Sequence, residues 1–317
     1  MVQPMSAEPA ALPYAALDVP VRGGTLRTGV WGPPDAQAPA ILAVHGVTAS
    51  HRTWGLLAQE LDGVRVIAPD LRGRGRSNGL PGPFGMAAHA DDLAEVLAAH
   101  GVGRAVVVGH SMGAFASVVL ARRHPRLVES LVLVDGGLPL QVPAGLSDEE
   151  VIQSVLGPAA ERLAATFPSR EAYRDFWRVH PAFAEHWNAL VEDYVDYDLA
   201  GEPPLLRPAT NYEAMARDTA DLNSGAVLMD ALESLAVPAA LLRAPRGLLN
   251  EDAGLYTPGY VDGWARRLPA LRVREVAGTN HYTIVMDHPG AAAVADAVRE
   301  ALSGRAAGRA AGQGPVR

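Results

Sequence analysis

The stretch VVVGHSMGAF, Val106–Phe115, decides the fold expected for this chain. Three β-branched apolar residues predict a buried strand, and the small and helix-forming residues after Ser111 predict a helix. A serine in such a strand–helix turn has a strained backbone and a side chain raised above the sheet edge. The turn is crowded, so the residues two before and two after the serine must be small, and these are Gly109 and Gly113. The pattern predicts a nucleophile at Ser111, facing the free N–H groups and positive dipole end of the helix.

Short apolar runs alternate with helical segments along most of the chain, which is typical of a mostly parallel sheet covered by helices. Strands are predicted at 25–31 (as a half-exposed antiparallel edge strand), 40–44, 64–69, 105–109, 130–135, 238–244 and 271–277. Helices are predicted at 52–61, 85–101, 112–124, 258–268 and 289–302. From about 136 to 235 the sequence is instead amphipathic, helical and rich in aromatic residues, which predicts a helical insertion.

These patterns predict a single α/β domain with an inserted cap. Its expected parts are a disordered N-terminus (1–13), a first core segment (14–136), a helical cap (137–235), a second core segment (236–302) and a disordered tail (303–317). The N-terminus lacks the basic region and apolar run of a secretory signal, and no apolar stretch of about 18 residues could span a membrane. We therefore expect a cytoplasmic protein with no membrane partner.

Composition excludes several kinds of chemistry. The net charge of −8 over 317 residues argues against nucleic acid or an anionic membrane as a partner. The sequence has no cysteine, which excludes disulfides, thiol nucleophiles and cysteine-ligated metals. It also has no lysine, which excludes Schiff-base catalysis and a Walker A nucleotide site. No histidine pair has zinc-type spacing with a nearby carboxylate, so we expect no metal and no cofactor.

Three further segments, with the Gly-His-Ser-Met-Gly turn, carry a resemblance to the α/β-hydrolase family that covers about Val21 to Leu302. AVHGVTAS (Ala43–Ser50) resembles the His-Gly loop after the third strand. APDLRGRGRS (Ala68–Ser77) resembles the loop after the fourth strand, and GTNHYT (Gly278–Thr283) resembles the loop that bears the catalytic histidine. The resemblance implies an α/β-hydrolase fold, a mostly parallel sheet flanked by helices with a helical cap.

Serine-based hydrolysis needs a base, an oxyanion hole and an orienting acid. The resemblance makes His281 the base, because it follows the last strand and keeps the chain order of serine, acid and histidine. By position in the family pattern, the Val47 amide is one oxyanion donor, and the Met112 amide at the helix start is the other. His45 and His110 belong to the motifs and are expected to pack and hydrogen-bond loops.

The position of the acid departs from the common family pattern. That pattern places an Asp after the strand at 238–244, where this chain has Gly247, and Glu251 and Asp252 follow later. Asp135 instead ends the strand at 130–135 and precedes two glycines. This placement resembles the haloalkane dehalogenases and the zearalenone lactonases. Asp135 is the predicted acid, Asp252 or Glu251 is the alternative, and a simple turn cap is the other reading of Asp135.

The substrate pocket is expected under the cap. Its predicted walls are Trp177, Trp187 and Phe183 from the cap and Leu138 next to the acid. Three loop arginines are expected to bond backbone carbonyls and Asp70 rather than to clamp an anion: Arg72, Arg74 and Arg76.

The predicted function is that of a serine hydrolase that cleaves an ester or lactone of a small hydrophobic substrate through an acyl-enzyme. A serine nucleophile argues against dehalogenase and epoxide-hydrolase chemistry, and the resemblance to zearalenone lactonases points to a macrocyclic lactone. The alternatives are a generic carboxylesterase, a C–C bond or amide hydrolase, a perhydrolase, and a receptor of this fold that retains its ligand. An apolar cap surface could support a homo-oligomer.

Overall fold

An eight-stranded sheet forms the centre of the computed structural model, which describes residues 12–143, 145–147, 149–150, 152, 156–222 and 225–312. The strands are β1 (Tyr14–Val21), β2 (Gly24–Trp31), β3 (Ala40–Val44), β4 (Arg65–Pro69), β5 (Ala105–His110), β6 (Val128–Val134), β9 (Ala239–Arg243) and β10 (Leu271–Glu275). Their order is β1-β2-β4-β3-β5-β6-β9-β10. β2 pairs antiparallel with β1 and β4, and the strands from β4 to β10 run parallel. The sheet confirms the predicted α/β-hydrolase architecture.

Helices cover both faces of the sheet, because its strands alternate apolar residues toward two cores. One core joins the sheet to α2 (Met86–Ala99), α3 (Met112–Arg123), α9 (Ala226–Glu233) and α10 (Pro258–Arg267). The other joins it to the 3₁₀ turn η1 (His51–Trp54), α1 (Gly55–Glu60), α11 (Thr283–Met286) and α12 (His288–Gly312). Both faces of the parallel strands are therefore buried, which explains why their sequences are continuous apolar runs.

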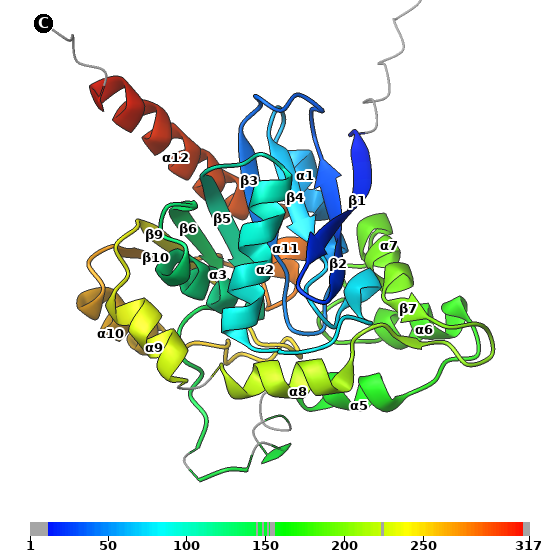
Figure 1. The fold of residues 1–317 in the computed structure, drawn as a ribbon. Coiled ribbons are helices and arrows are strands. Elements are labelled where there is room, and N and C mark those ends of the chain that lie inside the picture. The colour runs from blue at the N-terminus through cyan, green and yellow to red at the C-terminus, as the bar shows by residue number, and fades with distance from the viewer. Residues whose placement is uncertain are drawn as a thin grey trace, which may run out of the picture.

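The segment between β6 and β9 contributes further helices at one end of the sheet. They are α5 (Pro158–Ala164), α6 (Arg170–Arg178), α7 (Ala189–Tyr197) and α8 (Tyr212–Ala220), followed by α9. A two-stranded ribbon of β7 (Leu199–Ala200) and β8 (Arg207–Pro208) interrupts them. Figure 1 shows α5 and α8 running beneath the sheet, with α6 and α7 to one side near β2. This segment lies over the end of the sheet where β5 and β6 finish.

The prediction that 25–31 forms an edge strand was wrong. β2 lies between β1 and β4, and β1 forms the edge. β1 pairs with β2 along its whole length, from Tyr14 opposite Trp31 to Val21 opposite Gly24. Most of β1 is exposed, so its sequence carries no core-facing periodicity that would have identified it as a strand.

The C-terminal helix also differs from the sequence-based expectation. A disordered tail was predicted from 303, but α12 continues to Gly312. Alanine and arginine are strong helix formers, and they outweigh the interspersed glycines in this segment. Residues 1–11 and 313–317, to which disorder was also assigned, lie outside the described residues. Within the part of the chain that the structure describes, no helix is both long and apolar enough to cross a membrane.

Candidate active site

Ser111 lies at the turn between β5 and α3 with a backbone conformation unusual for a residue with a side chain. Its φ is 52° and its ψ is −126°. Of the described residues other than glycine, only Ser111, Asp135 and Asn250 have positive φ. Such conformations are strained and gather at functional sites. Two of these three residues are the predicted nucleophile and the predicted acid.

The glycines around Ser111 are required by close approach of the backbone. A Cβ at Gly109 would lie 2.5 Å from the Gly113 carbonyl oxygen, and one at Gly113 would lie 2.0 Å from the Val44 carbonyl oxygen. On the facing loop, a Cβ at Gly46 would lie 3.2 Å from Ser111 Cβ. The tight elbow predicted from the sequence spacing is therefore sterically specified from three sides.

His281 follows β10 and hydrogen-bonds to Asp135 at the end of β6. His281 Nδ1 lies 2.7 Å from Asp135 Oδ2, and the Asp135 side chain is fully buried. The other carboxylate oxygen accepts the Ala244 amide at 3.1 Å, and the Asp135 amide donates to Leu242 O at 2.7 Å. A carboxylate on Nδ1 fixes the proton there and leaves Nε2 as the basic nitrogen.

Two residues hold the His281 loop from either side. His110 Nε2 donates to the His281 carbonyl at 2.8 Å. Asn280 is buried, and its Oδ1 accepts the amides of Tyr282 and Thr283, both at 2.9 Å. Its side-chain NH₂ donates to Ala182 O of the cap segment at 3.1 Å. The histidine is therefore positioned by its neighbours on the loop as well as by Asp135.

The predicted oxyanion donors are the backbone amides of Val47 and Met112. Met112 is the first residue of α3, and Val47 follows the glycine that contacts Ser111. Neither amide has an acceptor among the hydrogen bonds of the described residues. Arg74 contacts both residues from behind, because its Nε donates to Val47 O at 2.8 Å and its Nη2 lies 3.7 Å from Met112 Sδ.

The two motif histidines near Ser111 are kept neutral by burial. Burial lowers the pKa of His45 to about 3, and its Nε2 accepts the Leu71 amide at 2.9 Å. Burial, with His281 nearby, lowers the pKa of His110 well below its usual range. Its Nδ1 is buried without a hydrogen-bond partner among the described residues. Both side chains therefore position loops, in agreement with the sequence-based expectation.

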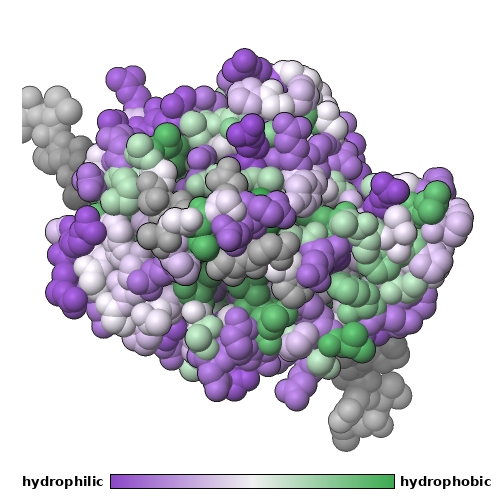
Figure 2. Space-filling view, turned by 90° about the horizontal axis from the view of Figure 1, so that it is seen from below, coloured by the Kyte–Doolittle hydropathy of each residue, from purple (hydrophilic) through white to green (hydrophobic). Residues whose placement is uncertain are grey.

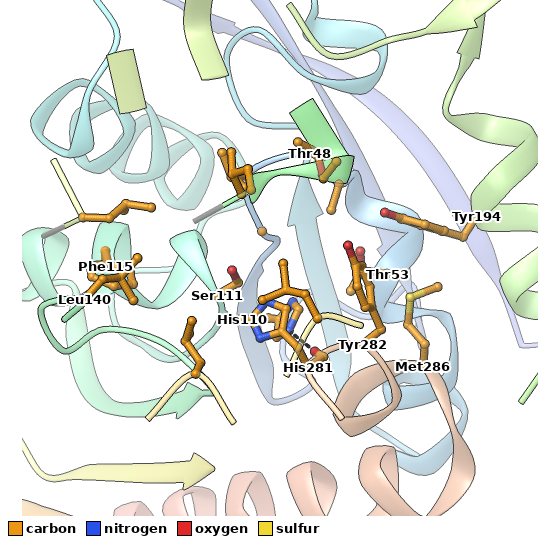
Figure 3. A pocket seen from close by; sticks show the side chains of 18 residues that line it. Thr48, Thr53, His110, Ser111, Phe115, Leu140, Tyr194, His281, Tyr282 and Met286 are labelled. Atoms are coloured by element: carbon orange, nitrogen blue, oxygen red, sulfur yellow. Dashed lines mark hydrogen bonds between the residues drawn. The ribbon is translucent and has the colours of Figure 1, made fainter. Parts of the chain in front are cut away.

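A cavity of about 40 Å³ meets Ser111 and His281. Figure 3 shows His110, Ser111 and His281 together at its centre. Most of the other lining residues are apolar or hydroxyl-bearing: Val47, Thr48, Ala49, Thr53, Phe115, Leu140, Leu156, Ala159, Tyr194, Leu222, Leu248, Leu255, Tyr282 and Met286. Figure 2 views the molecule from the cap side and shows hydrophobic residues gathered near the middle of that face. The described lining contains no Asp, Glu or Arg.

The predicted pocket walls do not line this cavity. Trp177 and Phe183 are buried behind Tyr282, with ring centroids 6.1 and 5.1 Å from that of Tyr282. Trp187 lies instead beneath the Arg178 guanidinium, 5.3 Å away. Leu138 is also fully buried, and its carbonyl accepts the Tyr256 hydroxyl. The aromatic cap residues pack the cap, and the cavity wall is formed by Tyr282 in front of them.

The alternative acids make other contacts. The Asp252 side chain is 98% exposed and lies 3.8 Å from Arg246. Glu251 Oε2 accepts the Leu249 amide at 2.7 Å. The Gly247 amide donates to Glu251 O, so the loop folds back on itself. Among the hydrogen bonds of the described residues, neither carboxylate reaches His281.

The loop arginines bond carbonyls, as expected, but two of them bond other aspartates than the predicted Asp70. Arg72 forms a buried ion pair with Asp92, and Arg74 forms one with Asp218 of α8. Arg76 contacts Asp70 through its backbone amide. No arginine lines the described part of the cavity.

Sequence reasoning did not identify several residues of the site. Thr53, Tyr194 and Tyr282 face the cavity, but a lone threonine or tyrosine carries no motif. Asn280 immediately precedes the predicted histidine, and that adjacency was the available signal. Among the described residues, no group of three or more His, Asp or Glu side chains is arranged to hold a metal ion.

Comparison with known sequences agrees with this geometry. The family model described as alpha/beta hydrolase fold matches residues 39–221, more than half of the chain. The lipase LipV of Mycobacterium tuberculosis is 39% identical over 181 residues, which cover 49% of this chain and 68% of that protein. The 2-(acetamidomethylene)succinate hydrolase of Mesorhizobium japonicum is 29% identical over 249 residues, covering 77% and 82%. An uncharacterized protein of Mycobacterium tuberculosis is 37% identical over 100 residues, only 29% of its own length.

Solved structures show the same architecture. The crystal structure of E-2-(acetamidomethylene)succinate hydrolase matches with a TM-score of 0.76 and 22% sequence identity, covering 92% of this chain and all of that one. At this level of identity the likeness establishes the fold. The family match, the sheet order and the strained serine turn between β5 and α3 agree. The chain belongs to the α/β-hydrolase fold family.

Proposed function

We propose that this protein is a serine hydrolase that cleaves carboxylic esters, lactones included, of uncharged and largely apolar substrates. The observation that carries the proposal is the 2.7 Å hydrogen bond between buried Asp135 and His281, at the cavity that Ser111 also lines. A serine hydroxyl is a weak nucleophile at neutral pH and needs such an oriented imidazole. Asp135 holds the Nδ1 proton in place and stabilises the imidazolium that forms during the reaction.

The proposed reaction has two halves. Ser111 Oγ attacks the ester carbonyl carbon while His281 Nε2 takes the hydroxyl proton, and the Val47 and Met112 amides hold the resulting oxyanion. The tetrahedral intermediate collapses, His281 gives the proton to the leaving alcohol, and the acyl group stays on Ser111. Water then attacks the acyl-enzyme with His281 as base, which releases the carboxylic acid and restores the serine. Each oxyanion donor typically supplies about 3 kcal/mol of transition-state stabilisation.

The lining of the cavity supports an uncharged substrate. Its described residues include many apolar side chains and no arginine. The relative named for 2-(acetamidomethylene)succinate acts, by that name, on a dicarboxylate, and proteins usually bind carboxylates with arginine. The relative named lipase fits the lining better. A macrocyclic lactone of the zearalenone type belongs to the same class of uncharged apolar esters.

The test combines labelling with product analysis. Wild type and Ser111→Ala are treated with a fluorophosphonate, and the labelled residue is found by peptide mass spectrometry. Both are also incubated with p-nitrophenyl esters of increasing chain length and, separately, with zearalenone. We expect labelling at Ser111 and ester cleavage by the wild type alone.

Three outcomes contradict parts of the proposal. Cleavage that persists in Ser111→Ala removes Ser111 as the nucleophile. Cleavage of p-nitrophenyl esters without addition of water to zearalenone excludes the zearalenone-type macrolactone as a substrate. Labelling at Ser111 without turnover of any ester favours the ligand receptor over the enzyme.

A further inference from the structure

Besides Ser111 and Thr48, three hydroxyl groups on the cavity wall have no hydrogen-bond partner among the described residues. Thr53 Oγ1 is buried without a partner in the described structure, and Thr53 as a whole is only 3% exposed. Tyr194, at 2% exposure, and the partly buried Tyr282 line the same cavity. Buried polar atoms such as Thr53 Oγ1 are nearly always paired, and an exception calls for an explanation such as a binding role.

Tyr194 and Tyr282, which have no hydroxyl partner among the described residues, differ from every other tyrosine of the chain. The sequence has eight tyrosines, and all lie within the described residues. The other six each hydrogen-bond through their hydroxyl group: Tyr14 to His51, Tyr173 to Asp198, Tyr197 to Asp70, Tyr212 to Glu149, Tyr256 to Leu138 and Tyr260 to Pro139. Within the described structure, the tyrosine hydroxyls therefore have partners except for the two that face the cavity.

These hydroxyls keep their protons and so can donate as well as accept. Burial raises the pKa of Tyr194 and of Tyr282 above the ordinary value. A threonine hydroxyl likewise donates one hydrogen bond and accepts others. Because the described lining lacks charged carboxylates and guanidinium groups, the three hydroxyls suit an uncharged oxygen better than an ion.

The opposite side of the cavity is apolar. Figure 3 shows Phe115 and Leu140 on one side of Ser111, with Thr53, Tyr194 and Tyr282 on the other. A substrate whose carbonyl lies at Ser111 thus extends in two chemically different directions. One direction suits hydrocarbon, and the other suits hydrogen-bonding oxygen.

We propose that Thr53, Tyr194 and Tyr282 form a subsite for an uncharged oxygen-bearing group of the substrate, a hydroxyl, ketone or ether. We call these three residues the hydroxyl wall. The substrate is then an amphipathic ester, with hydrocarbon on one side of the scissile carbonyl and an oxygenated group on the other. This inference rests on the proposed ester hydrolysis at Ser111 and narrows its substrate class.

The test uses ester pairs that differ by one oxygen at constant size. Methyl 6-hydroxyhexanoate is compared with methyl heptanoate for the acyl side, and 2-methoxyethyl acetate with butyl acetate for the alcohol side. The readout is the ratio of kcat/KM for the oxygenated ester to that for its hydrocarbon partner. We measure it for wild type, Tyr194→Phe, Tyr282→Phe and Thr53→Val. On one side of the carbonyl, each lost hydroxyl that bonds the substrate should lower the ratio by roughly three- to tenfold.

Two matched variants control for the loss of a hydroxyl elsewhere. Thr28 Oγ1 is also buried without a partner in the described structure, so Thr28→Val matches Thr53→Val. Tyr212 lies on the surface at 46% exposure, so Tyr212→Phe matches the tyrosine variants. Both controls should keep the wild-type ratio for each ester pair, because neither residue lines the cavity.

The outcomes separate the subsite from the reaction. Ser111-dependent hydrolysis with ratios that stay at the wild-type value in all three hydroxyl-wall variants overturns the subsite alone. Equal changes in the controls overturn it too, because the effect is then not local to the wall. Absence of Ser111-dependent hydrolysis for every ester overturns the proposed function and the subsite with it.

Discussion

Replacing Asp218 by Asn should strongly destabilise the protein, because its carboxylate forms a fully buried ion pair with Arg74. Asp218 lies on α8 of the cap segment, and Arg74 lies on the loop after β4. The carboxylate also accepts His89 Nε2 at 2.9 Å and the Gly85 amide at 2.6 Å. Burial alone would raise the pKa of Asp218, but Arg74 and His89 hold it well below the usual range. The carboxylate is therefore charged at neutral pH.

The magnitude follows from the burial of both partners, whose side chains have no exposed surface. Removing one partner of a buried ion pair leaves the other charge uncompensated and costs about 3–5 kcal/mol. Natural domains have free energies of unfolding of about 5–15 kcal/mol, so Asp218→Asn should lose a large share of the protein's stability. Arg74 also bonds Val47 O, so movement of Arg74 should displace a proposed oxyanion donor. We therefore expect kcat to fall more than KM rises.

The assay is urea unfolding followed by circular dichroism, together with ester kinetics on the folded fraction. Arg122 and Asp230 provide a matched control, because they form an ion pair of 2.9 Å between α3 and α9 but are exposed. Exposed pairs contribute about 0–1 kcal/mol, so the free energy of unfolding of Asp230→Asn should be close to that of wild type. A double-mutant cycle with Arg74→Met and Asp218→Asn gives the coupling energy, which should exceed that of the exposed pair.

Two results would refute this reasoning. If the free energy of unfolding of Asp218→Asn lies within about 1 kcal/mol of the wild-type value, the buried pair stabilises the protein no more than a surface pair does. If Asp218→Asn is strongly destabilised but its folded fraction retains the wild-type kcat, Arg74 does not position the Val47 amide. The first result concerns the electrostatics of the cap contact, and the second concerns only its link to the active site.

Three further predictions test the site and its supports. Asp135→Asn should lower kcat by about 10³–10⁴-fold through loss of tautomer control, whereas Asp252→Asn should leave steady-state kinetics near wild type; the reverse would make Asp252 the acid. His45, with its pKa lowered to about 3, stays neutral in the folded protein while the unfolded chain takes up a proton below about pH 6.5. Its contribution to stability is therefore lost as pH falls from 6.5 toward 3, by up to about 1.4 kcal/mol per pH unit, and urea midpoints of His45→Gln should show a shallower decline. Gly113→Ala should fail to fold or lose activity, because its Cβ would meet a backbone carbonyl of β3 at 2.0 Å; wild-type melting and kinetics would contradict the steric argument.

Local sequence was sufficient for the parts of the fold that rest on local patterns. Buried parallel strands have apolar faces on both sides, so β3 and β5 can be predicted from their continuous apolar runs. The elbow at Ser111 can be predicted because its steric demands fix small residues at set spacings. β1 could not be predicted from the sequence, because backbone pairing with β2 defines it and its side chains are largely exposed.

Tertiary structure decided what depends on residues distant in the chain. The choice between Asp135 and the later carboxylates concerned a contact across 146 positions of sequence, and the structure brings Asp135 to His281. The cavity wall could not be read from aromatic content, because cap aromatics such as Trp177 pack inward while Tyr282 covers them. The sequence by itself determined the serine turn, because its steric demands fix small residues at set spacings, and its resemblance to the α/β hydrolases indicated the fold family and the loop of the histidine. Which hydroxyls and apolar groups face the substrate was decided only by how the cap packs on the sheet, because that packing sets which side chains find partners inside the protein.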